Sequence, residues 1–178
     1  MDASSTYQDS LPVSSDALLQ KLQDWKLNYN YHQHTPLRTV EDAKSIEDTL
    51  LISGEAAFRV KNLFLRDKKK RNYLVTLQQD RAIDLKSLGA QLGIGNLSFG
   101  SPERLMQNLG VRPGAVSPLA MINGANQGVR FFLDSSVKKA DRAYVHPLVN
   151  DRTLGMPVAD LMRFFEIVGA NPEWLDSK

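Results

Sequence analysis

The sequence contains no cysteine in 178 residues, which excludes disulfide bonds, thiolate metal sites and a cysteine nucleophile. It has only three histidines, so neither a histidine-rich metal centre nor any other cofactor is expected. No apolar run approaches the roughly 20 residues that a membrane-spanning helix needs. Lys and Arg number 22 against 20 Asp and Glu, a net charge of +2, so contact with phosphates has to be local.

The length suits one domain, because a chain of this size buries enough surface for a real core. Residues 1–15 are rich in Ser and Asp, with neither a basic start nor an apolar stretch, and predict a flexible N-terminal tail. Residues 16–178 then form the single domain. A cytoplasmic location is expected, with neither a membrane nor DNA as partner.

Capping residues and apolar spacing predict helices and strands in irregular alternation. Helices are expected to begin near Ser14 and Thr39 and to cover 84–92, 102–109 and 157–168. Strands are expected at 57–65, 73–77, 96–99 and 129–133, with a strand end at 143–147 and a polar loop at 31–36. Without regular βαβ units, the class is α+β, with a mixed, curved sheet flanked by helices.

A lysine and an asparagine interrupt the apolar strand predicted at 57–65. Side chains alternate along a strand, so Lys61 shares a face with Leu63, and Asn62 shares the other face with Phe64. A buried lysine requires a partner or a cleft, and Lys61 is therefore a candidate for contact with an anion. The pattern alone equally allows a lysine that reaches solvent at a sheet edge and an asparagine that caps a neighbour.

Two loops combine features of binding sites with simpler explanations. Residues 114–118, Gly-Ala-Val-Ser-Pro, would let a carbonyl or ribose approach the backbone, but an ordinary tight turn has the same composition. Ser117 lacks the Gly-x-Ser-x-Gly context of a nucleophile and is expected to bond within its loop. The basic turn at 67–72 is read first as a solvated hairpin tip and second as a phosphate contact.

Four short blocks in order resemble the prolyl-tRNA editing family, which includes the YbaK-like and ProX-like deacylases and an insertion domain of bacterial prolyl-tRNA synthetases. The blocks are residues 61–65, 97–99 with 101–105, 114–118 with 122–123, and 146–150 with 159–161, and the similarity extends from about 34 to about 170. They most closely resemble the ProX-like branch, which removes alanine from proline tRNA. The resemblance implies a mixed sheet rolled toward a barrel and a hydrolase for the ester of mischarged tRNA.

The resemblance also implies roles for individual residues. The catalytic candidates are Lys61, Gly114 and Ala115; the substrate-binding candidates are His34, Asn62, Val116, Ser117, Pro118 and His146. In the family, backbone amides and the terminal ribose hydroxyl of the substrate are thought to carry much of the catalysis. For His146, a purely structural role in a loop is an equal alternative.

The expected partners are the acceptor end of mischarged proline tRNA and the prolyl-tRNA synthetase. Arg59 and Val60 stand where relatives often carry small or hydroxyl residues, so the size of the pocket is open. Two alternatives remain: a deacylase for cysteine or another small amino acid, and a module that binds tRNA or the synthetase without catalysis.

Overall fold

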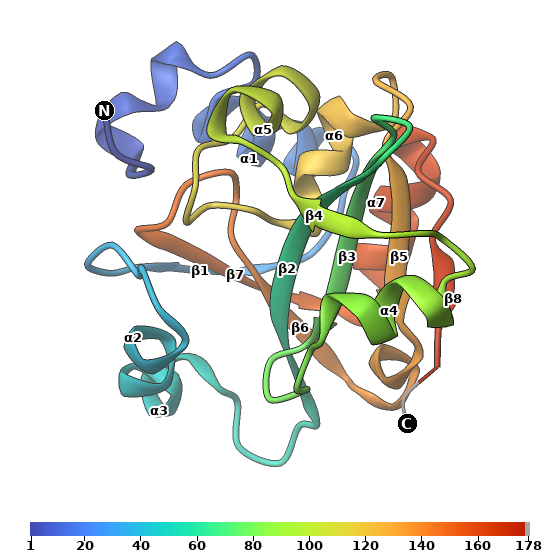
Figure 1. Cartoon of the computed structure of the whole chain (residues 1–178). Coiled ribbons are helices and arrows are strands. Elements are labelled where there is room, and N and C mark those ends of the chain that lie inside the picture. Colours follow the sequence, from blue (N-terminus) through green and yellow to red (C-terminus); the bar gives the residue numbers. More distant parts are fainter. Residues whose placement is uncertain (177–178) are drawn as a thin grey trace.

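A mixed β-sheet forms the centre of the molecule, with helices packed on it (Figure 1). The computed structural model describes residues 1–176. Within them the strands are β1 (Asn30–Gln33), β2 (Ala57–Asp67), β3 (Asn72–Gln78), β4 (Leu97–Phe99), β5 (Arg130–Asp134), β6 (Arg142–Val145), β7 (Arg152–Pro157) and β8 (Glu173–Leu175). Their order is β1, β7, β6, β2, β3, β5, β8, and β4 pairs with β2 beside this path. Strand pairs β2–β6, β3–β5 and β5–β8 are parallel.

The helices are α1 (Ser15–Asp24), α2 (Val40–Ser45), α3 (Glu47–Leu50), α4 (Leu85–Gln91), α5 (Pro102–Leu109), α6 (Met121–Gly124) and α7 (Val158–Val168), with 3₁₀ turns η1 (Ser5–Ser10), η2 (Pro118–Ala120) and η3 (Ser135–Lys139). Four of the helices, α1, α2, α4 and α5, begin where the capping signals predict. Ser14 caps α1, and Thr39 forms a capping box with Asp42 on α2. Ser101 caps α5, which ends at Gly110 with a φ of 65°.

The strands are apolar on both faces because helices cover both faces. Phe64 and Leu74 lie in the larger core cluster, which includes residues of α1, α5 and α7. Their neighbours Leu65 and Val75 lie in the second cluster, which includes Leu88 of α4. This alternation is the period of two that a doubly covered strand requires. The α+β class and the mixed sheet are confirmed.

Three short strands and two short helices were absent from the sequence prediction. The polar loop expected at 31–36 contains β1, an exposed strand that pairs with β7. Strands β7 and β8 and the four-residue helices α3 and α6 were also missed. β1 was missed because it has no apolar alternation. Backbone bonds to β7, and not buried side chains, hold it in the sheet.

The N-terminal residues differ from the flexible tail that composition predicts. Ala3 and Ser4 are buried, and residues 5–10 form η1. The carboxylate of Asp151 accepts hydrogen bonds from the Ser5 backbone N–H at 2.9 Å and its hydroxyl at 2.6 Å. Composition does not reveal these contacts, because low hydrophobicity carries no signal for polar bonds to a distant loop.

Candidate functional site

The principal pocket opens where two parallel strands separate. β2 and β6 pair from Ala57 opposite Arg142 to Arg59 opposite Tyr144, after which β2 continues along β3 and β6 ends at Val145. The space in this fork lies beyond the paired ends of parallel strands, a common position for ligands. The strand register therefore determines where the pocket is.

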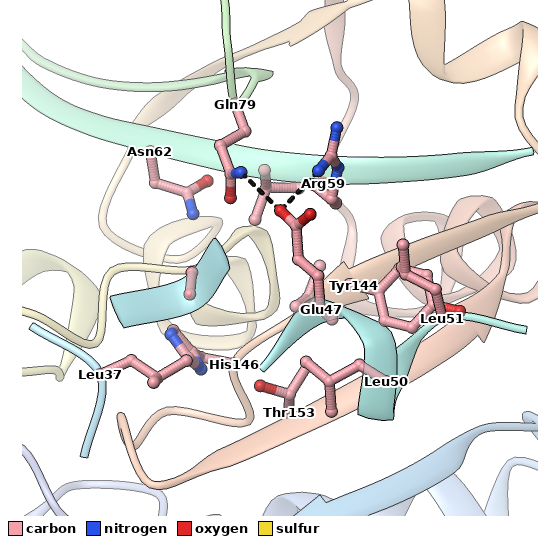
Figure 2. A pocket seen from close by; sticks show the side chains of 13 residues that line it. Leu37, Glu47, Leu50, Leu51, Arg59, Asn62, Gln79, Tyr144, His146 and Thr153 are labelled. Atoms are coloured by element: carbon pink, nitrogen blue, oxygen red, sulfur yellow. Dashed lines mark hydrogen bonds and ion pairs between the residues drawn. The ribbon is translucent and has the colours of Figure 1, made fainter. Parts of the chain in front are cut away.

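The inner part of the pocket is small, mostly apolar, and covered by α2 and α3. It encloses about 90 Å³, and Leu37, Leu50 and Val60 contribute to its wall. Figure 2 shows the Glu47 carboxylate directed at Arg59 and Gln79 within this space. Because Arg59 neutralises Glu47, the inner pocket does not present an unpaired charge from this carboxylate.

The outer part of the pocket brings the sequence-predicted residues together. It encloses about 230 Å³ and adds Lys61, Gly114 and Val116 to walls that it shares with the inner part, among them Asn62 and His146. A small inner space thus opens to solvent past the loop at 113–118.

A tight turn gives this loop its shape. The Ala115 N–H donates to the Arg112 carbonyl at 3.0 Å, with Pro113 and Gly114 at the two central positions. Gly114 has a φ of 94°, so this is the arrangement of a type II turn, which favours proline followed by glycine. A Cβ at Gly114 would meet only the Asn150 Nδ2 at 3.5 Å, so the left-handed backbone, rather than space, requires glycine.

The structure changes the prediction of which backbone amides are available to a substrate. Ala115 is fully buried and its N–H is used inside the turn, so its expected role as an amide donor is not supported. In the described residues, the N–H groups of Gly114, Val116 and Ser117 have no acceptor. Gly114 and Val116 also line the outer pocket, and they replace Ala115 as the candidate donors.

Asn62 connects β2 to the loop. Its Nδ2 donates to the Val116 carbonyl at 3.0 Å, and its Oδ1 accepts from the Thr76 hydroxyl at 2.7 Å. The amide is therefore held at both ends and orients residue 116. The alternation predicted for β2 is observed, since Asn62 faces the loop and its neighbour Lys61 bonds elsewhere.

The Lys61 ammonium donates to the carbonyl oxygen of Arg81. The side chain is half-buried, and Lys61 lines the same outer pocket as Gly114. The amine thus has a carbonyl partner and does not extend into open solvent, contrary to the edge-lysine alternative. An ammonium has three donors, and this bond occupies one of them.

His146 stands at the junction of the inner and outer pocket. Its Nδ1 faces the Arg152 carbonyl at 2.7 Å, and because a carbonyl only accepts, Nδ1 carries the proton. Burial lowers the pKa of His146, so the ring is neutral at pH 7 and its Nε2 is an acceptor. The structural alternative is correct for Nδ1, while Nε2 stays free for a ligand.

His34 supports the pocket from the side. Its ring lies 6.3 Å from that of His146, centre to centre, and its Nε2 is 2.8 Å from the Thr153 hydroxyl. His34 itself does not line the pocket, whereas Thr153 does. His34 therefore lies behind the pocket wall and contacts the wall residue Thr153.

Ser117 and Pro118 shape the loop from within. Ser117 is fully buried, and its hydroxyl accepts from the Leu119 N–H at 3.1 Å, which caps η2. Pro118 is the buried first residue of η2. The rejection of a serine nucleophile is consistent with this geometry, and neither side chain lines the pocket.

The inner-wall residues Glu47, Gln79, Tyr144 and Thr153 were missed. They come from α3, the turn after β3, β6 and β7, and none forms a recognisable spacing with another. The one available signal was Tyr144, which lies two residues before His146 in a strand end. Residues 1–176 contain no group of three acidic or histidine residues suited to a metal, and none of their helices is long and apolar enough to span a membrane.

Comparisons with known proteins agree on one family. The model of the aminoacyl-tRNA editing domain matches residues 34–164. The prolyl-tRNA editing protein ProX of Acetoanaerobium sticklandii is 36% identical over 159 residues, covering 89% of this chain and 92% of that protein. The prolyl-tRNA synthetase associated domain-containing protein 1 of Mus musculus is 40% identical over 117 residues, covering 63% of this chain and 69% of that protein.

A solved structure shares the fold. It is the crystal structure of a protein provisionally assigned as a trans-editing enzyme for prolyl-tRNA synthetase, with a TM-score of 0.63 over 92% of this chain and 98% of that chain. The two sequences are 17% identical, so this likeness concerns the fold alone.

Proposed function

The chain belongs to the family of aminoacyl-tRNA editing domains, and on that basis we propose that it deacylates mischarged proline tRNA, with alanine as the preferred aminoacyl group. The reaction is hydrolysis of the ester between the amino acid and the terminal ribose. It acts on tRNA that a synthetase has already released, which is editing in trans.

One observation carries the proposal: a small apolar space lies directly behind backbone N–H groups that have no acceptor. The inner pocket, about 90 Å³, suits a short aminoacyl side chain. The unpaired amides of Gly114 and Val116 are at its entrance. Such preorganised donors stabilise the negative charge that develops on a carbonyl oxygen when an ester is attacked.

The hydrolytic step follows from these positions. The ester carbonyl lies against the loop, its oxygen accepting from the Gly114 and Val116 N–H groups, while a water oxygen bonds to the carbonyl carbon. The bond from that carbon to the ribose oxygen then breaks, and the ribose oxygen takes the proton that the water loses. The products are a free amino acid and the uncharged tRNA.

The proton transfer is assigned to the substrate and not to a strong base of the protein. Glu47 is neutralised by Arg59, and Lys61 is held by a carbonyl, so neither offers a free base. The neighbouring hydroxyl of the terminal ribose assists the water. The neutral His146 accepts a hydrogen bond at Nε2 and orients this hydroxyl or the water.

Lys61 and Asn62 have separate roles. The remaining donors of Lys61 hold the terminal ribose or its phosphate at the mouth of the pocket. Asn62 fixes the Val116 carbonyl and thereby holds in place the loop that carries the N–H donors. Lys61→Ala is expected to lower kcat/KM about tenfold or more, since a hydrogen bond to a charged group is worth roughly 1.5–3 kcal/mol.

A second, editing site is needed because the synthetase alone selects its amino acid with limited accuracy. A site shaped for proline discriminates poorly against a smaller amino acid, because a lost methylene is worth only about 1–3 kcal/mol. The apolar wall of Leu37 and Val60 favours a methyl group over the hydroxyl of serine, which loses its water contacts there.

The deciding experiment is a release-rate panel on one tRNA. Alanyl, cysteinyl, seryl and prolyl esters of the same proline tRNA are mixed with excess enzyme, and single-turnover rates are measured. Alanine is expected to be released fastest and proline at the uncatalysed rate. Lys61→Ala is compared with Lys86→Ala, an exposed lysine of α4 outside the site.

Each other outcome overturns a stated part of the proposal. Faster release of cysteine would make the chain a cysteinyl deacylase. Binding without release of any ester would make it a non-catalytic module. A prolyl-tRNA synthetase partner, which the name of the mouse relative suggests, is tested by adding the synthetase and measuring complex formation directly.

A further inference from the structure

Strand β4 separates two surface hollows that the proposed hydrolysis does not use. One, here called the β4 groove, holds about 310 Å³ between β2, the start of α5 and the loop at 113–116, with Phe99 and Gly100 at its edge. The other, the basic hollow, holds about 260 Å³ and contains Arg66, Lys68 and Lys70 beside Leu97 and Ser98. Figure 1 shows β4 lying across β2, beneath α5.

The β4 groove is continuous with the catalytic pocket. Asn62, Gly114 and Val116 line both the groove and the outer pocket. The loop that carries the free amides therefore forms the common wall between the two spaces. A ligand anchored by its end in the pocket therefore has an apolar path past this loop.

Phe99 exposes its ring at this groove. The exposed fraction of Phe99 is 63%, the largest of any aromatic residue within residues 1–176. A single exposed apolar residue is ordinary on a protein surface. Here the strand backbone is fixed, because the Gly100 N–H donates to the Phe64 carbonyl at 3.0 Å and a Cβ at Gly100 would meet the Phe64 ring at 2.4 Å.

The basic hollow carries cations without acidic partners. No ion pair within residues 1–176 involves Arg66, Lys68 or Lys70. The carboxylate present, Asp67, accepts from Arg71 Nε at 2.6 Å and from the Tyr73 hydroxyl at 2.9 Å. The hollow thus presents net positive charge on a hairpin tip that Asp67 holds in place.

The three spaces follow one line along β2. Asn62 borders the pocket, Phe64 borders the groove, and Asp67 borders the basic hollow. Five residues of extended strand span about 16 Å at 3.3 Å each. An apolar ring followed by cations, starting at an ester-binding site, is the pattern of a surface for single-stranded nucleic acid.

We propose that the single-stranded 3′ end of the tRNA leaves the pocket along β4, with a base stacked on the Phe99 ring and backbone phosphates at Lys68 and Lys70. This inference rests on the proposed function and names where the same substrate continues beyond the ester. It explains how a chain of net charge +2 holds a polyanion, since the few contacts are concentrated beside the site.

The stacking contact is tested with Phe99→Ala, Phe99→Trp and the control Trp174→Ala. Trp174 is another exposed aromatic residue, on the distant edge strand β8. With alanyl proline tRNA, Phe99→Ala is expected to raise KM about tenfold and leave kcat within about twofold, because stacking on an aromatic ring is lost. Phe99→Trp is expected to restore KM, and Trp174→Ala to leave it unchanged.

The phosphate contact is tested by the salt dependence of 1/KM. The double variant Lys68→Gln/Lys70→Gln is expected to reduce the slope of log(1/KM) against log salt by about 1.4, since each phosphate contact to a single strand contributes about 0.7. Lys86→Gln, on the exposed side of α4, is the control and should keep the wild-type slope.

The outcomes separate the two proposals. A wild-type protein that releases no amino acid from any ester contradicts the proposed function. A wild-type protein that does so, while Phe99→Ala keeps the wild-type KM and the lysine variant keeps the wild-type slope, contradicts the β4 path alone.

Discussion

Asn62 shows how a polar residue in an apolar strand shapes a site without touching the reacting bond. Its side chain bonds the Val116 carbonyl on one side and the Thr76 hydroxyl on the other. The Val116 carbonyl is thereby fixed to β2, while the N–H groups of Val116 and Ser117 on either side of it have no acceptor within the described residues. Substrate binding by this amide was the sequence prediction and stays a prediction; from the two bonds we propose that Asn62 also positions the loop.

Asn62→Ala is expected to lower kcat about tenfold or more while changing KM less, because the loop that carries the N–H donors loses the bond that fixes it at the Val116 carbonyl. Thr76→Val removes only the partner of Oδ1 and should give a smaller loss. Single-turnover rates well below the unfolding temperature measure both, and Asn126→Ala, an exposed asparagine, is the control. Equal kcat for Asn62→Ala and wild type would contradict the role.

At the scale of elements, the N-terminal segment 1–11 supports the pocket from behind. The Asn150 N–H donates to the Ala3 carbonyl, and Ser5 donates twice to the Asp151 carboxylate. The carbonyls of the same two residues accept from the N–H groups of Leu37 and His34. The segment therefore acts through loop 148–151 on residues 34–37, although it lies outside the range of the family model.

Ser5→Ala is expected to lower the free energy of unfolding by about 1–3 kcal/mol, since a buried carboxylate loses one of its donors. KM should rise as well, because the loop that seats Leu37 loosens. Tyr7→Ala, which changes an exposed ring in the same segment, is the control and should alter neither quantity appreciably. Chemical denaturation and steady-state kinetics measure the two effects; an unchanged unfolding free energy for Ser5→Ala would show that the segment does not support the loop.

On the scale of the whole molecule, β2 joins the two halves of the sheet. Its first residues pair with β6 and the remainder with β3, so the fork that opens the pocket also couples both halves. The far end of β2 is held by Asp67. Burial alone would raise the pKa of Asp67, but the bonds from Arg71 and Tyr73 outweigh it and lower the pKa to about 2.

This carboxylate makes the fold sensitive to acid. Its pKa is near 3.8 in the unfolded chain and about 2 in the folded one, so it stabilises the protein above pH 4 and this contribution is lost as the pH falls from about 4 to 2. Asp67→Asn should unfold more easily than wild type at pH 6, and the difference should shrink toward pH 2. Denaturation at several pH values measures it, with Asp24→Asn, at the exposed end of α1, as control.

Most elements of this fold are predictable from sequence because their signals are local. Ser14, Thr39 and Ser101 each precede a helix and bond its first turn, and β2 and β3 alternate as a doubly covered hairpin must. β1 and α3 escape prediction, since both bury no residue of their own and exist through contacts with β7 and Arg59.

The sequence by itself determined most of the longer elements, the compact loop at 114–118 and the resemblance to the family, because each depends on residues close together in the chain or on short ordered blocks. Only the tertiary structure decided which amides are free. It uses the Ala115 N–H inside the turn and leaves that of Val116 open, and it places Glu47, Tyr144 and Thr153 around the inner pocket. These facts depend on how β2 and β6 separate, which is a matter of register between residues more than 80 positions apart.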